Sequence, residues 1–217
     1  MIYIRSLLFL FGLCVFSLGI AITIKVDYLG LHPWDVLGVA LYEQIGFSIG
    51  TWNILIGVVL IIIAFILDKS YIKIGTFLNA MIIGVMLDIY LSLGFLPEAS
   101  HTWLDVVMII TGIIIMGVGG GLYNAARIGS GPRDGFMLSL SDKTGLSVGL
   151  VRIITELTVL LIAWLIGGTI FIFTFIFTFV QSPIFQFVYL RLSRVVDRYD
   201  EQLKARKFQR ESVPKAK

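Results

Sequence analysis

Charged residues are scarce in this sequence. Asp, Glu, Lys and Arg make up 14% of its 217 residues, whereas 58% are hydrophobic and the mean hydropathy is +0.95. Soluble domains carry roughly 25% charged residues. The composition therefore excludes a soluble fold and indicates a protein of the lipid bilayer.

Cysteine and histidine are also scarce. The single cysteine, Cys14, lies inside an apolar run, and the two histidines, His32 and His101, are far apart. Neither a disulfide framework nor a clustered Cys or His metal site is compatible with these numbers. P-loop and serine nucleophile-elbow motifs are missing too. We therefore expect no metal, no cofactor and no catalytic residue, and an intramembrane enzyme is disfavoured.

Basic residues are unevenly distributed. Nine of the 17 Lys and Arg residues lie after Leu190, so the net charge of +3 belongs to the C-terminal tail and does not indicate nucleic acid as a partner. Apolar residues recur in this tail at helical spacing. Residues 191–217 are predicted to form a cytoplasmic, basic, amphipathic tail that binds anionic lipid headgroups. A helix that binds a partner protein is the alternative.

Long charge-free runs predict the membrane spans. A helix needs about 20 apolar residues to cross the hydrocarbon core. Three charge-free runs have this length, and a fourth, at residues 74–93, contains one acid, Asp88, near its end. A fifth run, of 34 uncharged residues from Leu157 to Leu190, is divided by a turn at Gly167 and Gly168. The six predicted spans are residues 6–24, 44–67, 74–93, 106–126, 147–166 and 169–190. No small-x-small cleavage site follows the first run, so we expect a span there and not a signal peptide.

The positions of the basic residues predict the topology. If both termini are cytoplasmic, 16 of the 17 Lys and Arg residues lie inside and only Lys25 lies outside. The positive-inside rule favours this multi-pass orientation in the plasma membrane. Four residues then lie at or beyond the external edge, where we expect them to be solvated: Asp88, Glu98, His101 and Asp105.

The sequence repeats itself at an offset of 99 residues. The pattern G-x-x-P-x-D, followed ten residues later by G-x-S-x-G, runs from Gly30 to Gly50 and again from Gly129 to Gly149. An offset of 100 also aligns two glycines of the first span, Gly12 and Gly19, with Gly112 and Gly119. An ordered set of matches of this kind indicates two related halves.

Each half contains three predicted spans, an odd number, so the second half enters the membrane from the opposite side. We predict an all-α polytopic membrane protein of about six transmembrane helices, arranged as two inverted three-helix repeats at residues 1–100 and 101–190. Inverted repeats of this kind recur in secondary transporters, where the binding site lies between the repeats.

A short apolar segment follows the first span of each half, at residues 33–44 and 132–143. Both segments are too short to span the bilayer and too apolar for plain loops, so they are predicted to be re-entrant or interfacial helices. Each begins with proline and carries Asp35 or Asp134 in its first turn, which favours helix initiation. The Gly129-Ser130-Gly131 segment before Pro132 is also compatible with a backbone nest that binds an anion. A simple turn into an interfacial helix is the alternative.

These features resemble the YczE/YyaS/YitT family of bacterial membrane proteins. The resemblance covers about residues 5–190 and is carried by the doubled Pro-x-Asp segments, by Gly145–Gly149 followed by Arg152 and Glu156, and by the Gly167–Gly168 turn. Its most specific part is Gly129–Gly135. The resemblance implies a polytopic protein of the bacterial inner membrane, and it supplies no substrate.

Two ionisable residues lie inside the fifth predicted span. Arg152 and Glu156 are four residues apart on one helix face, about 8 and 14 Å from the start of the helix. Ionisable groups at this depth are costly unless paired or hydrated, and they mark functional sites by default. A structural ion pair is the alternative. The equivalent residues of the first half are Asn53 and Gly57, so only one half carries the pair.

The predicted site lies between the two repeats and has no catalytic or metal-binding residue. Its candidate residues are Arg152, Glu156, Asp134, Arg133, Asp35, Asn53 and Asn79, although a packing role is an alternative for Asn79. The architecture predicts a small-solute or ion transporter, with a homodimer expected because six short helices enclose little volume. The alternative is a non-transporting accessory or scaffold protein that supports a partner such as a biosynthetic assembly.

Overall fold

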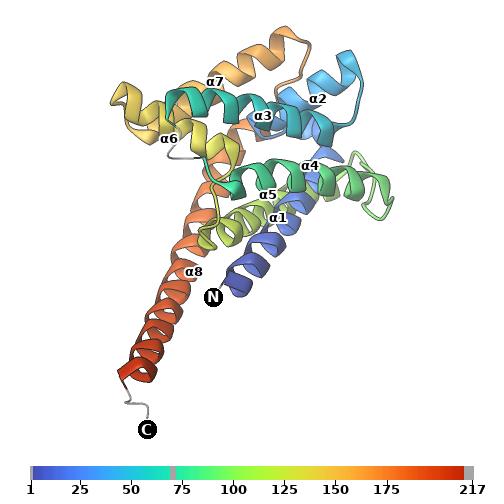
Figure 1. Cartoon of the computed structure of the whole chain (residues 1–217). Helices are drawn as coiled ribbons and strands as arrows, with labels where there is room; N and C mark the ends of the chain where they lie inside the picture. Colours follow the sequence, from blue (N-terminus) through green and yellow to red (C-terminus); the bar gives the residue numbers. More distant parts are fainter. Residues whose placement is uncertain (1, 69–71, 213–217) are drawn as a thin grey trace.

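The computed structural model describes residues 2–68 and 72–212, and these residues form helices and connecting loops with no strand (Figure 1). The described chain contains eight α-helices and one 3₁₀-helix. They are α1 (Ile2–Ile24), η1 (Asp27–Leu29), α2 (Pro33–Ile45), α3 (Ile49–Leu67), α4 (Ile74–Ser92), α5 (Trp103–Ala125), α6 (Pro132–Thr144), α7 (Val148–Leu165) and α8 (Ile172–Ser212). The predicted all-α class is confirmed.

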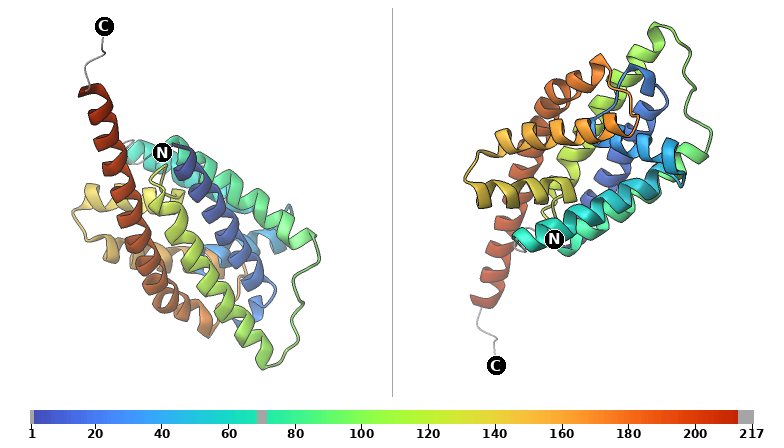
Figure 2. Two further views of the ribbon diagram at one scale, coloured as in Figure 1. Left: turned by 90° about the horizontal axis from the view of Figure 1, so that it is seen from below. Right: turned by 90° about the horizontal axis from the view of Figure 1, so that it is seen from above.

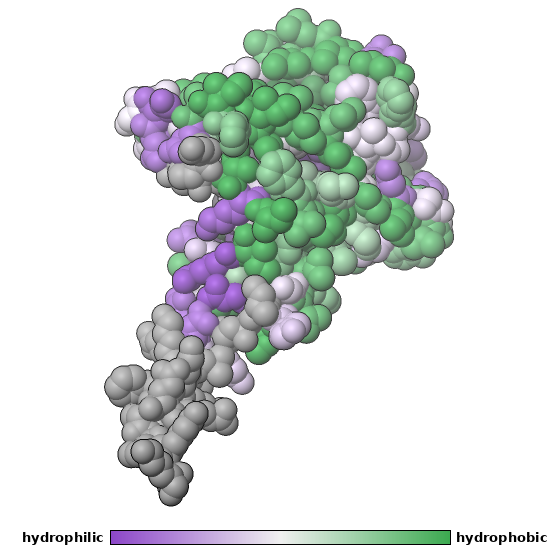
Figure 3. Space-filling model, viewed as in Figure 1, coloured by the Kyte–Doolittle hydropathy of each residue, from purple (hydrophilic) through white to green (hydrophobic). Residues whose placement is uncertain are grey.

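Among the described residues, five helices are long and apolar enough to cross a membrane. They are α1, α3, α4, α5 and the Ile172–Asp200 part of α8. Helix α7 has 18 residues, about 27 Å at 1.5 Å per residue, which is close to the roughly 30 Å of a hydrocarbon core. The structure thus has several candidate spans, and the count of six stays a prediction. Hydrophobic residues cover most of the face shown in Figure 3.

Local sequence explains where the helices begin and end. The short helices α2 and α6 each have 13 residues and begin with Pro33 and Pro132, as predicted. Ser48 and Ser147 are the N-caps of α3 and α7, and the side-chain oxygen of each accepts a hydrogen bond from a backbone N–H of the first turn. After α7 the chain turns at Gly167, whose φ of 105° favours glycine.

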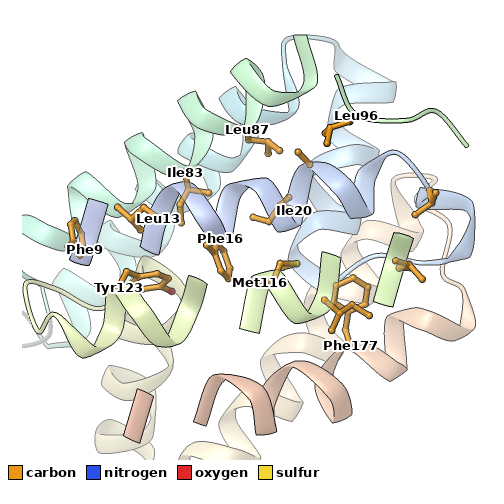
Figure 4. Close-up of a cluster of buried hydrophobic side chains, with 14 of the residues drawn as sticks. Phe9, Leu13, Phe16, Ile20, Ile83, Leu87, Leu96, Met116, Tyr123 and Phe177 are labelled. Carbon is orange, nitrogen blue, oxygen red and sulfur yellow. The ribbon is translucent and has the colours of Figure 1, made fainter. Parts of the chain in front are cut away.

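Helix α1 lies at the centre of the molecule and contacts both α4 and α5. Figure 4 shows its side chains directed into the hydrophobic core between these helices. Leu13 and Ile20 of α1 and Met116 of α5 are fully buried. On its other side, α5 contacts α8.

Glycines allow α1 and α5 to approach each other backbone to backbone. A Cβ atom on Gly119 would lie 2.4 Å from the Phe16 nitrogen and 2.9 Å from the Gly12 oxygen. A Cβ atom on Gly19 would lie 2.8 Å from the Gly112 oxygen. Gly12 therefore meets Gly119, and Gly19 meets Gly112, in an antiparallel crossing where any side chain would force the helices apart.

Each short helix contacts long helices of both halves. Helix α2 packs on α3 and on α7, while α6 packs on α7 and on α3. The loops before the short helices are also tightly packed. A Cβ atom on Gly30 would lie 2.7 Å from the Thr174 nitrogen, and one on Gly129 would lie 2.7 Å from the Thr76 nitrogen. These contacts fix the starts of α2 and α6 against α8 and α4.

Helix α8 is one continuous helix of 41 residues that passes through Pro183 and beyond residue 190. Asp197 pairs with Arg127 at 2.7 Å, and Asp200 pairs with Arg5 near the start of α1. The start of α1 and the C-terminal part of α8 accordingly lie at one end of the molecule (Figure 2). Residues 191–212 of the predicted tail thus belong to α8, and the side chains after Asp200 lie outside the described part of the chain.

The prediction that Asp105 is solvated is wrong. Asp105 is fully buried, and its carboxylate accepts hydrogen bonds from the Tyr28 hydroxyl at 2.6 Å, from the Ser100 nitrogen and hydroxyl at 3.0 and 2.8 Å, and from the His101 nitrogen at 2.7 Å. The bond from Tyr28 raises the pKa of its phenol to about 12. Asp105 therefore joins η1 and the loop between α4 and α5 to the start of α5.

Candidate functional site

A pocket of about 100 Å³ lies where the two halves of the chain meet. Residues of all eight α-helices, including their N-caps, line it. Six of the seven predicted site residues are among them: Asn53, Asn79, Arg133, Asp134, Arg152 and Glu156. The seventh, Asp35, reaches the pocket through its ion pair with Arg133. The structure thus brings together residues that are up to 121 positions apart in the sequence.

One ion pair joins the two short helices. The Arg133 guanidinium of α6 lies 3.1 Å from the Asp35 carboxylate of α2, and the Asp35 side chain is only 2% exposed. The same guanidinium lies 5.6 Å from the centre of the Trp34 ring. Arg133 is therefore held by both a charge and an aromatic face.

A second group of charges runs across α6, α7 and the start of α2. Arg152 lies 3.6 Å from Asp134 and 3.6 Å from Glu156, which confirms the predicted contact between Arg152 and Glu156. Glu156 in turn lies 4.0 Å from the His32 Nε2 atom. The Glu156 side chain is 11% exposed and that of Arg152 is 42% exposed. The group thus reaches from the buried pocket to a more open surface.

Carboxylates and guanidiniums meet in these two groups. They contain three carboxylates, Asp35, Asp134 and Glu156, and two guanidiniums, Arg133 and Arg152. Ionisable groups at this depth are costly unless they are paired or hydrated, so the groups of opposite charge stabilise one another.

Several buried polar atoms around the pocket have no hydrogen-bond partner among the residues that the structure describes. They are the Asn79 Nδ2, Trp34 Nε1, His32 Nδ1 and Asp35 Oδ2 atoms. Asn79 and Trp34 line the pocket and are 2% and 4% exposed. Most buried polar atoms in proteins are hydrogen-bonded. The arrangement is therefore suited to an occupant that supplies the missing partners.

A larger hollow of about 700 Å³ adjoins the pocket. Four residues line both spaces: Asp134, Met137, Arg152 and Phe185. The hollow also contacts Lys73 at the start of α4 and Arg127 after α5. The shared residues place this hollow beside the pocket, and in the predicted topology it faces the cytoplasm.

Sequence reasoning missed the aromatic and histidine residues of the pocket. Phe16 and Tyr123 meet edge to face with ring centres 5.7 Å apart (Figure 4), and His32 and Trp34 flank Pro33. The position of His32 and Trp34 inside the repeated Pro-x-Asp motif was a usable signal. Phe16 and Tyr123 carried none, because aromatic residues in apolar helices ordinarily belong to the core.

Comparisons with known proteins agree with a membrane protein. YczE of Bacillus subtilis strain 168, an uncharacterized membrane protein, is 35% identical over 160 residues, which cover 73% of this chain and 73% of YczE. An uncharacterized protein of Haemophilus influenzae is 31% identical over 178 residues, covering 82% of this chain and 80% of the relative. YyaS of Bacillus subtilis strain 168, also uncharacterized, is 28% identical over 160 residues, covering 73% and 79%.

No solved structure matches the chain significantly. The YczE and YyaS parts of the predicted resemblance are confirmed, and the YitT part stays a prediction. The model of one protein family matches residues 3–190, which is well over half of the sequence. The chain therefore belongs to the family of unknown function DUF6198.

Proposed function

We propose that this membrane protein transports a small solute or an ion, with the central pocket as its binding site. The carrying observation is that one pocket collects ionisable and unpartnered polar groups from both halves of an otherwise apolar chain. Secondary transporters built from inverted repeats hold their substrates at this place, near the bilayer midplane between the repeats. No catalytic activity is part of the proposal.

The contacts between the halves support an inverted repeat. When two units are related by a two-fold axis, their contacts occur in reciprocal pairs. If residue i of the first unit contacts residue j of the second, then residue j of the first unit contacts residue i of the second. Gly12 and Gly19 correspond to Gly112 and Gly119 at the offset of 100. Their contacts follow this rule, because Gly12 meets Gly119 and Gly19 meets Gly112.

A second set of contacts obeys the same rule. Gly30 corresponds to Gly129 at an offset of 99, and Thr76 corresponds to Thr174 at an offset of 98. Gly30 of the first half approaches Thr174 of the second, and Gly129 of the second half approaches Thr76 of the first. Two independent reciprocal contacts thus favour a two-fold axis that passes between α1 and α5, close to the pocket.

The proposed orientation is that of a multi-pass protein of the bacterial plasma membrane with both termini in the cytoplasm. In this orientation the hollow beside Lys73 and Arg127 opens to the cytoplasm. Transport then requires a rearrangement that closes this approach and opens an external one. The ion pairs between the halves are the contacts that such a rearrangement would exchange.

Uptake into proteoliposomes tests the proposal. Vesicles that contain the wild-type protein should accumulate at least one component of a mixture of small polar solutes and salts above the level of protein-free vesicles. Gly131→Leu should abolish this uptake, because its added side chain enters the pocket, where a Cβ atom already lies 3.3 Å from the Asn79 amide oxygen.

Gly38→Leu provides the matched control. Gly38 lies in the short helix α2, whereas Gly131 is the N-cap of the short helix α6. No atom lies within 4 Å of a Cβ atom built at Gly38, so this variant should transport normally. Uptake by the wild type no greater than by protein-free vesicles, or equal uptake by the two variants, would contradict the proposal.

A non-transporting accessory role is the second candidate function. It is favoured by the length of α8, which continues well past the other helices (Figures 1 and 2). A helix that extends beyond the membrane body offers a surface to a partner without involving the pocket. A partner bound by the wild type, released by truncation after Asp200 and retained by Gly131→Leu would favour this role.

A further inference from the structure

We propose that the hollow of about 700 Å³ beside the pocket binds the headgroup of an anionic phospholipid. We call this space the basic hollow, because three cationic side chains line it: Lys73, Arg127 and Arg152. The inference goes beyond the proposed function, since it concerns a lipid ligand and holds whether or not the protein moves a solute. Charge, hydrogen-bond donors, position and shape each point to this occupant.

The cations of the basic hollow come from three separate parts of the chain. Lys73 is the N-cap of α4, Arg127 follows the end of α5, and Arg152 lies in α7. Asp134 is the one acid among the described residues that line the hollow, and it pairs with Arg152. The lining therefore carries more positive than negative charge around one open space, and such a space attracts an anion.

These cations retain capacity for an anionic ligand. Lys73 is exposed and forms no ion pair with any described residue. Arg127 pairs with Asp197, but their side chains are 45% and 44% exposed, and an exposed pair of this kind is weak enough for the guanidinium to be shared with a ligand. The Arg152 guanidinium lies 3.6 Å from Asp134, farther than the roughly 2.7–2.9 Å of a charged N–H···O hydrogen bond.

Hydroxyl groups add uncharged donors to the same space. Ser130 and Tyr189 also line the basic hollow, and neither hydroxyl makes a hydrogen bond to another residue that the structure describes. The ionised phosphate diester of a phospholipid accepts hydrogen bonds and donates none. It therefore matches a lining that offers ammonium, guanidinium and hydroxyl donors together.

The position of the hollow favours a lipid over an anion from solution. Lys73 precedes the first residue of α4, Arg127 lies two residues after the last residue of α5, and both helices are candidate membrane spans. The ends of membrane spans lie at the level of the phospholipid headgroups. Basic side chains that converge between helices at this level recognise anionic headgroups.

The remaining lining is largely apolar, as the chains of a lipid require. Met137 and Leu138 of α6 and Phe185 of α8 line the hollow, and farther along α8 the side chains of Phe187 and Leu190 are exposed. A volume of about 700 Å³ corresponds to roughly 20 water molecules, so a free phosphate ion fills only a small part of it. A headgroup in the hollow, with its acyl chains along α8, uses both parts of this surface.

Lipid-dependent melting of the purified full-length protein in detergent tests the inference without requiring transport. Dioleoyl phosphatidylglycerol should raise the melting temperature in a saturable manner, and its mole fraction in the micelles at half-saturation gives an apparent Kd. Dioleoyl phosphatidylcholine has the same phosphate and acyl chains but no net charge, so it should be at least about tenfold weaker. Glycerol 3-phosphate has the headgroup chemistry without the chains and should give no saturable shift.

Single substitutions locate the site. Lys73→Gln and Arg127→Gln should each raise the apparent Kd for phosphatidylglycerol about fivefold, which is the contribution of one basic residue near an anionic headgroup. Arg198→Gln is the matched control, because it removes the same charge from an exposed position of α8 that does not line the hollow. Asp197→Asn removes the acidic partner of Arg127 and leaves the lining unchanged, so it should bind the lipid at least as tightly as the wild type.

A tail variant separates the basic hollow from the basic tail. The combined change of Lys204→Gln, Arg206→Gln and Lys207→Gln removes three positive charges after Asp200 and keeps the chain length. Binding in the hollow predicts a nearly unchanged Kd for this variant. A loss of binding in the tail variant, with none in Lys73→Gln, would assign the lipid to the tail and overturn the inference.

The remaining outcomes are equally decisive. Equal stabilisation by the two lipids, a saturable shift with glycerol 3-phosphate, an unchanged Kd in both hollow variants, or the same loss in Arg198→Gln each overturns the inference. Because Lys73 forms no ion pair among the described residues, Lys73→Gln should fold even if Arg127→Gln does not. Selective phosphatidylglycerol binding without solute uptake supports the inference and contradicts transport, whereas uptake with no preference between the lipids does the reverse.

Discussion

The ion pair between Arg133 and Asp35 should contribute measurably to stability, because it is buried and joins the two short helices. The Asp35 side chain is 2% exposed and that of Arg133 is 20% exposed, with 3.1 Å between nitrogen and oxygen. Removing one partner of a buried pair costs about 3–5 kcal/mol, since the other charge stays buried without a partner. Arg133→Gln leaves the more buried charge, that of Asp35, without its partner, so its loss of stability should lie near the upper end of this range. Asp35→Asn leaves a guanidinium that still contacts Trp34 and water, and should lie near the lower end.

The double variant distinguishes a pairing effect from simple loss of packing. Each single change is expected to lose stability mainly because it leaves an isolated charge. The loss of unfolding free energy in the double variant, Asp35→Asn with Arg133→Gln, should therefore be smaller than the sum of the two single losses by at least about 2 kcal/mol. The pair between Arg127 and Asp197 is the control. Its side chains are 45% and 44% exposed, and such a surface pair contributes about 0–1 kcal/mol.

Unfolding of the wild type, the two single variants, the double variant and the control variant Asp197→Asn in mixed detergent micelles measures these free energies. Thermal melting in a single detergent gives an independent ranking. A cost for Asp35→Asn no greater than that for Asp197→Asn would refute the argument from burial. Strict additivity in the Arg133 and Asp35 double variant would refute the argument from pairing.

Three further predictions concern packing and topology. Gly119→Leu should abolish folding or cause severe destabilisation, because the new side chain separates α1 from α5. Gly38→Ala should stabilise α2 by about 0.5–1 kcal/mol, because the space around Gly38 is open. Thermal melting of the two variants and the wild type measures both effects. Asp88→Ala should lower the unfolding free energy by about 1–2 kcal/mol. The Asp88 carboxylate accepts a hydrogen bond from the Gly50 nitrogen at 2.8 Å and so caps α3. An unchanged stability would contradict this role. Reporters fused after Lys217 and inserted near Ser100 should lie on opposite sides of the membrane, and finding them on one side would exclude the predicted topology.

The sequence predicted the helices well because each depends on local features. Apolar runs of span length became α1, α3, α4 and α5, and the two Pro-x-Asp segments became α2 and α6, each within one residue of its predicted end. Proline at the first helical position and glycine just after the last are local signals that tertiary contacts rarely override.

Partnerships across the fold were harder to predict. Asp105 is buried because Tyr28 and the Ser100–His101 backbone fold over it, and these donors lie 77 residues away and in the adjacent loop. Nothing in the residues next to Asp105 distinguishes this arrangement from a solvated turn. Arg152 and Glu156 were predictable as a pair since four residues along a helix guarantee proximity, whereas the contact of Glu156 with His32 depends on how α7 packs against α2.

The pocket itself follows from a repeat in which equivalent positions no longer carry equivalent residues. At the offset of 99, His32 corresponds to Gly131 and Glu156 corresponds to Gly57. His32 and Glu156 are in contact at 4.0 Å. Under the proposed two-fold relation, the residues that correspond to this pair are two glycines, which have no side chains. All four residues line the same pocket. A single backbone arrangement thus places an ionisable contact on one side of the pocket and two residues without side chains on the other, so the two halves contribute unequally to its polar lining.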